Sequence, residues 1–498
     1  MRRRHFLKLA STTTAFTAIG GIGWLLQSCK KDKMDMGKSV SVLEGSFYTP
    51  LPIPAIVKNP SLTAKSTTAS ILNGKTTRVF GYHESILGPT IKMMNGENAN
   101  ITFQNSLSEE TNIHWHGLLI PASMDGHPEN IVQAGSSFNF NFQINQRAGT
   151  YWYHPHPHGK TSHQVFMGLA GMFIVNDAEE ASLNLPDNDY EIPLVIQDKR
   201  IYSDYSLNYS PTSGEVMTGY FGQYVLVNGV YAPYSNVAKR FYRMRVLNGS
   251  TARIYNLALS DSASFYVIGA DGGLLNTSES VNSLLLAPGE RADILVNFSN
   301  YSLGTEIYLQ SNTFSNGVVQ GTQSFQIMKF TVSKSETTPF TVPATLSVIN
   351  PIPQTSASKT RTFDIAGMDM GSMGNMGGMG NMGSMAGMHT INGKSYDINR
   401  IDEEVTAGST EIWVFDNSMG DEIHPMHIHG VQFQVLDRTG GRNTLIATEK
   451  GWKDTVLVMP QEKVRVIMTF PQNKGKFVLH CHNLEHEDSG MMLNFKIS

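Results

Sequence analysis

Two patterns of closely spaced histidines occur near the start of the chain and again, in the same order, near its end. The early copies are His114-Trp115-His116-Gly117 and the run from Gly149 to His156, which ends in His-Pro-His. The late copies are His427-Ile428-His429-Gly430 and the run from Gly475 to His482, which ends in His-Cys-His. An internal repeat of this kind predicts homologous domains at the two ends of the chain.

Short runs of alternating apolar and polar residues indicate what these domains are made of. The run from Phe138 to Ile144 alternates strictly, and Tyr242 to Val246 and Val464 to Val466 do the same. A period of two, with Gly, Pro and Asn between the runs, is typical of antiparallel strands. Only 16% of the residues are charged, and the chain contains 45 glycines. We therefore predict an all-β fold of sandwich domains rather than helical bundles.

The length and composition of the chain suggest three domains. A chain of 498 residues is too long for a single hydrophobic core. The first domain closes near 176–180, and a segment rich in Ser, Thr and Pro at 333–360 links the second domain to the third. The sequence has no histidine between His163 and His389, so we expect the middle domain to bind no metal of its own. The predicted domains are 45–180, 185–335 and 361–498.

The first residues have the features of an export signal. Arg3-Arg4-His5-Phe6-Leu7-Lys8 matches a twin-arginine pattern, and an apolar run follows from Leu9 to Leu26. Leu26-Gln27-Ser28-Cys29 resembles a lipobox. We predict that residues 1–28 are a twin-arginine signal peptide, that the protein reaches the periplasm or cell envelope, and that Cys29 carries a lipid anchor. The alternative is an uncleaved membrane anchor, for which the threonines and glycines of the run are unfavourable.

Charge and cysteine content narrow the function. The formal net charge of -4 gives no sign of a nucleic-acid partner. The sequence has two cysteines, so with Cys29 in the lipobox Cys481 has no partner for a disulfide. Cys481 stands between His480 and His482, and in a strand these histidines point to one side and the cysteine to the other. Cys481 can then bind one metal while its neighbours bind others.

A blue-copper site is predicted around Cys481. One Cys, two His and a weak axial Met form such a site, and zinc sites rarely include a thioether. His486 and Met491 follow Cys481 by five and ten residues, and His424 is the best second histidine. Met492 is the competitor for the axial position. A lone His-x-His is usually two surface or core histidines, but four such pairs in two homologous domains favour a metal cluster.

These motifs resemble the four copper motifs of multicopper oxidases. Trp452 to Val456 and His480 to Met492 look especially like the bacterial cuprous oxidases of copper-efflux systems, and Leu247-Asn248-Gly249 and Pro288 to Arg291 fit the middle domain. The resemblance implies three cupredoxin-like Greek-key β-sandwich domains and a metal cluster between the first and third.

The resemblance also implies four copper ions and a ligand set for each. The type 1 copper would take His424, Cys481, His486 and Met491. The type 2 copper would take His114 and His427. The type 3 pair would take His116, His154 and His482 on one ion, and His156, His429 and His480 on the other. His127, His158, His163 and His389 are expected not to be ligands.

The same resemblance implies an enzyme that reduces O2. A reductant would give single electrons to the type 1 copper, and Cys481 would pass them through His480 and His482 until four reduce O2 to water. Because that reaction consumes protons, acids near the cluster are required. Asp125 and Glu487 match the family's acids; the alternatives are an ordinary turn aspartate and an exposed glutamate.

The segment 368–388 bears on the substrate. Seven methionines, from Met370 to Met388, recur at every third position among Gly, Asn and Ser. Thioethers are soft ligands that favour Cu(I), so we predict capture of Cu(I) for oxidation; the alternative is a low-complexity linker. The family's Met and Asp cluster before the first type 1 histidine is out of register here. Candidates for an additional substrate Cu(I) site are Met368, Asp369, Met370, Met419 and Asp421.

The sequence thus predicts a multicopper oxidase that oxidises Cu(I) to Cu(II) for copper tolerance. The alternatives are a general laccase that oxidises phenols and a copper-binding lipoprotein without turnover. The expected partners are O2 and either Cu(I) or a phenolic reductant. We expect a monomer.

Overall fold

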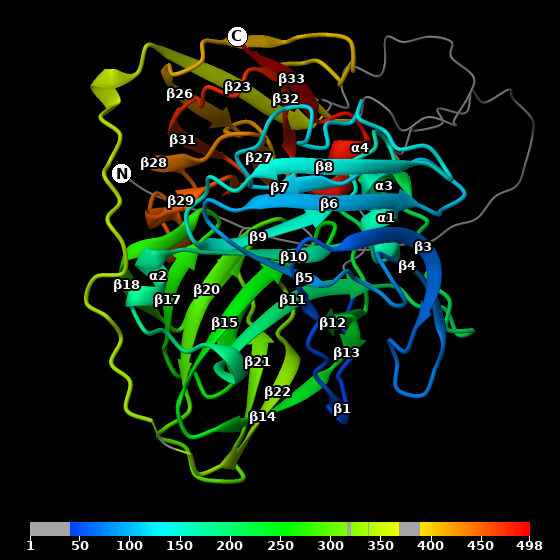
Figure 1. Cartoon of the computed structure of the whole chain (residues 1–498), viewed down its shortest axis with the longest axis vertical. Coiled ribbons are helices and arrows are strands. Elements are labelled where there is room, and N and C mark those ends of the chain that lie inside the picture. The colour runs from blue at the N-terminus through cyan, green and yellow to red at the C-terminus, as the bar shows by residue number, and fades with distance from the viewer. Residues whose placement is uncertain (1–39, 316–319, 337, 368–388) are drawn as a thin grey trace, which may run out of the picture. The chain divides into compact units, whose positions relative to one another are not determined.

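The computed structural model describes residues 40–315, 320–336, 338–367 and 389–498 (Figure 1). The predicted signal peptide, Cys29 and the methionine-rich segment with Met368, Asp369 and Met370 lie outside these residues. Within the described ranges, no helix is long and apolar enough to cross a membrane.

The first domain is a sandwich of two sheets. The strands are ordered β2-β5-β10-β9-β7 in one sheet and β4-β3-β6-β8 in the other. Trp115, Tyr153, Phe103 and Phe173 from both sheets pack into one core. The strands are β2 (Ile56–Val57), β3 (Ser61–Ala69), β4 (Thr77–Gly81), β5 (Thr90–Met94), β6 (Asn98–Asn105), β7 (His114–His116), β8 (Ser137–Gln143), β9 (Gly149–His154) and β10 (Gly171–Asn176).

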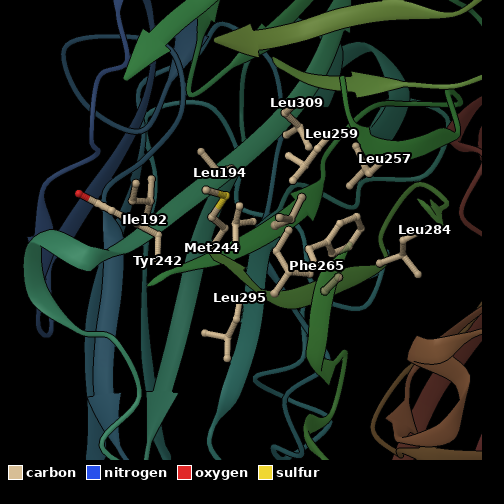
Figure 2. Packing of buried hydrophobic residues seen from close by; sticks show 14 of the residues in the cluster. Ile192, Leu194, Tyr242, Met244, Leu257, Leu259, Phe265, Leu284, Leu295 and Leu309 are labelled. Carbon is tan, nitrogen blue, oxygen red and sulfur yellow. The ribbon is translucent and has the colours of Figure 1, made fainter. Parts of the chain in front are cut away.

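The middle domain has the same two-layer form. Its sheets are ordered β1-β14-β22-β21-β16-β19 and β13-β12-β11-β15-β20-β17-β18. Figure 2 shows Leu194 and Met244 packed near Leu257, Leu259 and Phe265 in its core. The strands are β1 (Thr49–Pro50), β11 (Glu191–Lys199), β12 (Tyr224–Val227), β13 (Val230–Tyr231), β14 (Pro233–Ala238), β15 (Phe241–Asn248), β16 (Tyr255–Leu259), β17 (Phe265–Ala270), β18 (Gly273–Val281), β19 (Ser283–Leu286), β20 (Arg291–Asn297), β21 (Glu306–Ser311) and β22 (Phe325–Lys334).

The third domain repeats the sandwich with sheets β24-β23-β26-β31-β28-β29 and β25-β33-β32-β27-β30. Its core contains Trp413, Phe433, Phe477 and, among these apolar side chains, Cys481 and Met491. The strands are β23 (Lys359–Gly367), β24 (His389–Ile391), β25 (Glu403–Val405), β26 (Thr410–Asp416), β27 (His424–Ile428), β28 (Phe433–Gly440), β29 (Trp452–Lys453), β30 (Thr455–Val458), β31 (Glu462–Thr469), β32 (Gly475–Cys481) and β33 (Met492–Ile497).

Helices contribute little to this architecture. In the part of the chain that the structure describes, the α-helices are all short: α1 (Thr161–Met167), α2 (Ala178–Ser182), α3 (Ser213–Thr218) and α4 (Leu484–Asp488). The 3-10 turns are η1 (Asn188–Tyr190), η2 (Gln354–Ser356) and η4 (Ala447–Lys450). The prediction of an all-β fold built from sandwiches is therefore confirmed.

Two connections between the domains differ from a simple succession of units. Strand β1 precedes the strands of the first domain in sequence but pairs in parallel with β14 of the middle domain. The segment between β22 and β23 runs along the second and third domains (Figure 1), with Leu346 N–H donating to Asn276 O and Ile352 N–H to Gln434 Oε1. Both connections hold the outer domains against the middle one.

Candidate metal centres

Ten histidines and one cysteine are buried in the first and third domains. In the first domain β7 and β9 pair with His114 opposite His154, and in the third β27 and β32 pair with His427 opposite His480. Each of the ten imidazoles and the thiol is at most 1% exposed. The residues are His114, His116, His154, His156, His424, His427, His429, His480, Cys481, His482 and His486.

Three imidazoles converge through the same ring atom. His480 Nε2 lies 3.2 Å from His156 Nε2 and 3.1 Å from His429 Nε2. The opposite nitrogens are occupied, because His429 Nδ1 lies 2.7 Å from Asp125 Oδ2 and His480 Nδ1 lies 3.0 Å from Cys481 O. A neutral imidazole carries one proton, so protons at Nδ1 leave lone pairs on Nε2. Lone pairs that meet in this way fit a cation.

A second pair joins the two domains in the same manner. His114 Nε2 lies 3.4 Å from His427 Nε2, while Nδ1 of each ring lies near a backbone oxygen, at 2.7 Å from Asp125 O and 2.9 Å from Asp454 O. A ligand atom of His114 also lies within 4.8 Å of those of His116 and His154. The histidines from both domains therefore form one continuous cluster.

A third group contains His116, His154 and His482. Their ring centroids lie 5.0 to 5.7 Å apart. Among the described residues no hydrogen-bond partner exists for His116 Nδ1, His154 Nε2 or either nitrogen of His482, although all are buried. Buried nitrogens without a partner are costly unless something binds them, so this group also fits a metal ion.

The electrostatic environment keeps these imidazoles neutral. Burial, with a further effect from neighbouring imidazoles, lowers the pKa of His114, His156 and His429 well below its ordinary value. A metal ion needs the neutral imidazole as its ligand, so these lowered pKa values favour metal binding at neutral pH. The pKa values of His116, His427 and His482 are lowered in the same way.

A separate group surrounds Cys481. Its Sγ lies 3.6 Å from His424 Nδ1 and 3.7 Å from His486 Nδ1, and those two nitrogens are 3.2 Å apart. Met491 packs in the same apolar cluster as Cys481, whereas Met492 packs with Tyr396 and Val478. Burial raises the pKa of the Cys481 thiol well above its usual value, so metal binding would displace a proton from it.

The two groups are connected by consecutive residues. Cys481 ends β32 and faces His424 and His486, while His480 faces His156 and His429. His482 belongs to the third group of the cluster. The covalent path between the thiol and the histidine cluster is therefore only a few bonds long.

Both predicted acids contact the cluster. Asp125 is wholly buried, and burial raises the pKa of its carboxyl well above the ordinary value. Glu487 is 1% exposed, with Oε1 3.3 Å from His156 Nδ1 and Oε2 3.1 Å from His480 Nδ1. Each carboxyl group thus lies against Nδ1 of a cluster histidine, while Nε2 of the same ring faces the other imidazoles.

The other predicted residues lie elsewhere. Met419 is 93% exposed and Asp421 is also exposed. His127 Nε2 lies 2.8 Å from Asn494 Oδ1, His158 packs edge-on against Tyr396, and His163 packs edge-on against Phe80.

His389 has a more specific position than its sequence suggests. It stacks on His486 with ring centroids 3.9 Å apart, and its nitrogens lie 3.0 Å from Glu422 Oε2 and 2.6 Å from Ser489 Oγ. It therefore supports the Cys481 group from outside. No periodic pattern in the sequence indicates this contact.

Sequence reasoning also missed two residues of the cluster's surroundings. Asp454 Oδ1 lies 3.0 Å from His116 Nε2, and Arg291 of the middle domain binds Asp454 through both terminal nitrogens. Both residues belong to motifs that the sequence singled out, Trp452 to Val456 and Pro288 to Arg291, but no chemistry was assigned to them.

Comparison with known proteins gives consistent matches over nearly the whole chain. Family models described as multicopper oxidase match residues 63–180, 211–332 and 368–498. The chain is 33% identical to the multicopper oxidase mco of Staphylococcus haemolyticus, over 89% of each chain. It is 32% identical to a laccase of Bacillus subtilis, over 84% of this chain and 89% of the other.

Solved structures agree with this. The McoA multicopper oxidase of Aquifex aeolicus is 38% identical with a TM-score of 0.81, over 90% of this chain and 99% of that one. A multicopper oxidase of Campylobacter jejuni, described as a metallo-oxidase, is 30% identical with a TM-score of 0.80, over 92% and 96%. The predicted cupredoxin-like Greek-key domains are confirmed by these neighbours.

Proposed function

We propose that this chain, which belongs to the multicopper oxidase family, oxidises Cu(I) to Cu(II) and uses the electrons to reduce O2 to water. The family supports an oxidoreductase that binds copper and uses O2 with a reductant. The observation that carries the proposal is the pair of buried ligand groups joined by His480, Cys481 and His482.

Four copper ions would be held by these residues. His424, Cys481, His486 and Met491 would bind the type 1 ion, and His114 with His427 the type 2 ion. His116, His154 and His482 would bind one type 3 ion, and His156, His429 and His480 the other. When bound, the copper ions supply the one-electron redox chemistry that amino-acid side chains lack.

The protein's own groups would orient the histidine ligands and supply protons to the reaction. Backbone oxygens of Asp125, Asp454 and Cys481 fix Nδ1 of three imidazoles, which orients Nε2 inward. Asp125 and Glu487 would supply protons to reduced oxygen, since their carboxyl groups lie against the cluster histidines. Full burial of these residues excludes bulk water.

Cu(I) as the substrate is supported by composition and by one relative. The seven regularly spaced methionines at 370–388 offer soft sulfur ligands. The similar protein of Campylobacter jejuni is described as a metallo-oxidase. Met419 and Asp421, both exposed, are candidates for the substrate site together with Met368, Asp369 and Met370.

Deleting residues 368–388 tests this substrate. We expect the variant to lose Cu(I) oxidation and to keep or increase its oxidation of phenols, measured as oxygen uptake with each reductant. A matched variant with the seven methionines replaced by leucine keeps the length and apolar character of the segment but removes the sulfur. Unchanged Cu(I) oxidation in both variants would contradict the proposal.

A general laccase is the second candidate, because the similar Bacillus subtilis protein is named a laccase. For that function the methionine-rich segment is irrelevant, and neither variant would change the preference between Cu(I) and phenols. A copper-binding lipoprotein without turnover would consume no oxygen with a reduced dye.

We also propose where the protein acts. The twin-arginine pattern and Cys29 support export to the periplasm or cell envelope, with a lipid on Cys29, and we propose a monomer. Mass measurement of the mature N-terminal peptide tests the first part, and sedimentation tests the second.

A further inference from the structure

The middle domain contributes no histidine to the cluster, but one of its arginines reaches it. Arg291, the first residue of β20, donates from Nη1 to Asp454 Oδ1 at 2.7 Å and from Nη2 to Asp454 Oδ2 at 2.5 Å. Its Nε also donates to Thr150 O of β9 at 2.9 Å. Arg291 and Asp454 are both 0% exposed. This bidentate contact fixes the orientation of the Asp454 carboxylate.

The fixed carboxylate faces one histidine of the cluster. Asp454 Oδ1 lies 3.0 Å from His116 Nε2, and Thr455 Oγ1 lies 3.1 Å from the same nitrogen. A carboxylate only accepts hydrogen bonds, so the proton of neutral His116 is held on Nε2. The buried Nδ1 then carries the lone pair, and it has no partner among the described residues.

His116 is therefore turned the opposite way from its neighbours. In His114, His427 and His480 it is Nδ1 that faces a backbone oxygen, and Nε2 that faces another imidazole or the cluster. The second acceptor at this nitrogen, Thr455 Oγ1, donates its own proton to Asp454 Oδ1 at 3.0 Å, so its orientation also depends on the carboxylate. The Asp454 carboxylate therefore sets the tautomer of this ring, both directly and by fixing the Thr455 hydroxyl.

The chain packs tightly around Arg291 and Asp454. A Cβ on Gly117, next to His116, would overlap Asp454 Oδ2 and lie 2.8 Å from Arg291 Nη2. A Cβ on Gly289, two residues before Arg291, would lie 2.9 Å from the His482 ring. The turn of the middle domain thus packs against the ring of His482 and, through Arg291, against the glycine next to His116.

We propose that Arg291 and Asp454 form a positioning pair that sets the tautomer and orientation of His116, so that Nδ1 is its metal-binding atom. The proposal rests on copper binding by this cluster. It makes the middle domain a determinant of the copper site and not only a spacer between the outer domains.

Two variants test the pair. Asp454→Asn keeps the size of the side chain but places an amide between Arg291 and His116. Arg291→Lys keeps the charge but loses the bidentate contact with Asp454. Each variant is expected to lower the copper affinity of the His116 group by about 10–100-fold, the usual effect of losing a hydrogen-bond partner of a metal ligand.

The readouts are copper per chain and the fraction of copper visible by electron paramagnetic resonance. Both variants are expected to lose copper at the His116 group, which uncouples its partner ion and makes it visible. The blue absorption of the Cys481 group is expected to remain and reports that the chain has folded. Arg291→Lys keeps the test open if Asp454→Asn does not fold.

Arg243→Lys is the matched control. Arg243 is also buried and also joins domains, since it pairs with Asp293 and with Glu180 of the first domain. If it gives the same copper loss as Arg291→Lys, or if both test variants keep normal copper, the positioning role is overturned. A wild-type protein without blue absorption would instead overturn the proposed function itself.

Discussion

Asp125 shows how much of the proposed chemistry depends on single side chains. Burial raises the pKa of its carboxyl well above the ordinary value, so the protonated form persists at higher pH than in a free aspartate and is lost as pH rises through the folded pKa. We predict that Asp125→Asn lowers kcat for oxygen uptake by about 10²-fold. It should also remove the alkaline decline of the wild-type rate that this group causes, while the blue absorption stays unchanged. A wild-type kcat and pH profile in the variant would exclude Asp125 as a proton donor.

At the scale of elements, the contact between β11 and α1 contains a buried cation. Lys199 ends β11, and its Nζ donates to Val165 O of α1 at 3.3 Å. Burial, partly offset by Asp198, lowers the pKa of Lys199 to about 7. Between this pKa and the pKa of Lys199 in the unfolded chain, the unfolded chain binds more protons than the folded one. The loss of folding free energy caused by the buried charge is therefore complete below about pH 7 and disappears as pH rises toward about 10.

We therefore predict that Lys199→Met stabilises the protein on the order of a few kcal/mol at about pH 6, with no gain at about pH 10. Denaturant unfolding at the two pH values measures the difference. A gain that is equal at both values would show that packing, and not the buried charge, determines the effect.

At the scale of the whole molecule, a buried cluster of charges joins the first and middle domains. Glu180 of α2 pairs with Arg243 and Arg245. Burial alone would raise the pKa of Glu180, but Arg245 and Arg243 outweigh it and lower the pKa to about 2. The stability from this group is complete above its unfolded pKa and is lost as pH falls toward about 2.

Glu180→Gln is predicted to lower the free energy of unfolding by about 3–5 kcal/mol at neutral pH, because it leaves Arg243 and Arg245 buried without one of their anionic partners. The difference from wild type should shrink as the solution is acidified, which unfolding curves at several pH values measure. Glu97→Gln, which breaks an exposed pair with Lys58, is the control and should change little. A loss equal to that of Glu97→Gln would contradict the account of this interface.

Much of this molecule follows from its sequence. Strict alternation in Phe138 to Ile144 predicted β8, and the spacing after Cys481 singled out His486, whose Nδ1 lies 3.7 Å from Cys481 Sγ. The pairing of β1 with β14 could not be predicted, because a two-residue strand has no period. Arg291 and Asp454 are 163 residues apart, and no local pattern relates two residues that meet only through tertiary packing.

The most direct test of the central claim is the oxygen consumed in a single reoxidation. Copper-loaded protein is fully reduced without air and then mixed with O2, and the O2 consumed and any hydrogen peroxide released are measured per chain. If the Cys481 group and the histidine cluster are connected as proposed, each chain holding four copper ions consumes one O2 and releases no peroxide. Peroxide in amounts equal to the O2 consumed, or fewer than four copper ions bound per chain, would contradict the account.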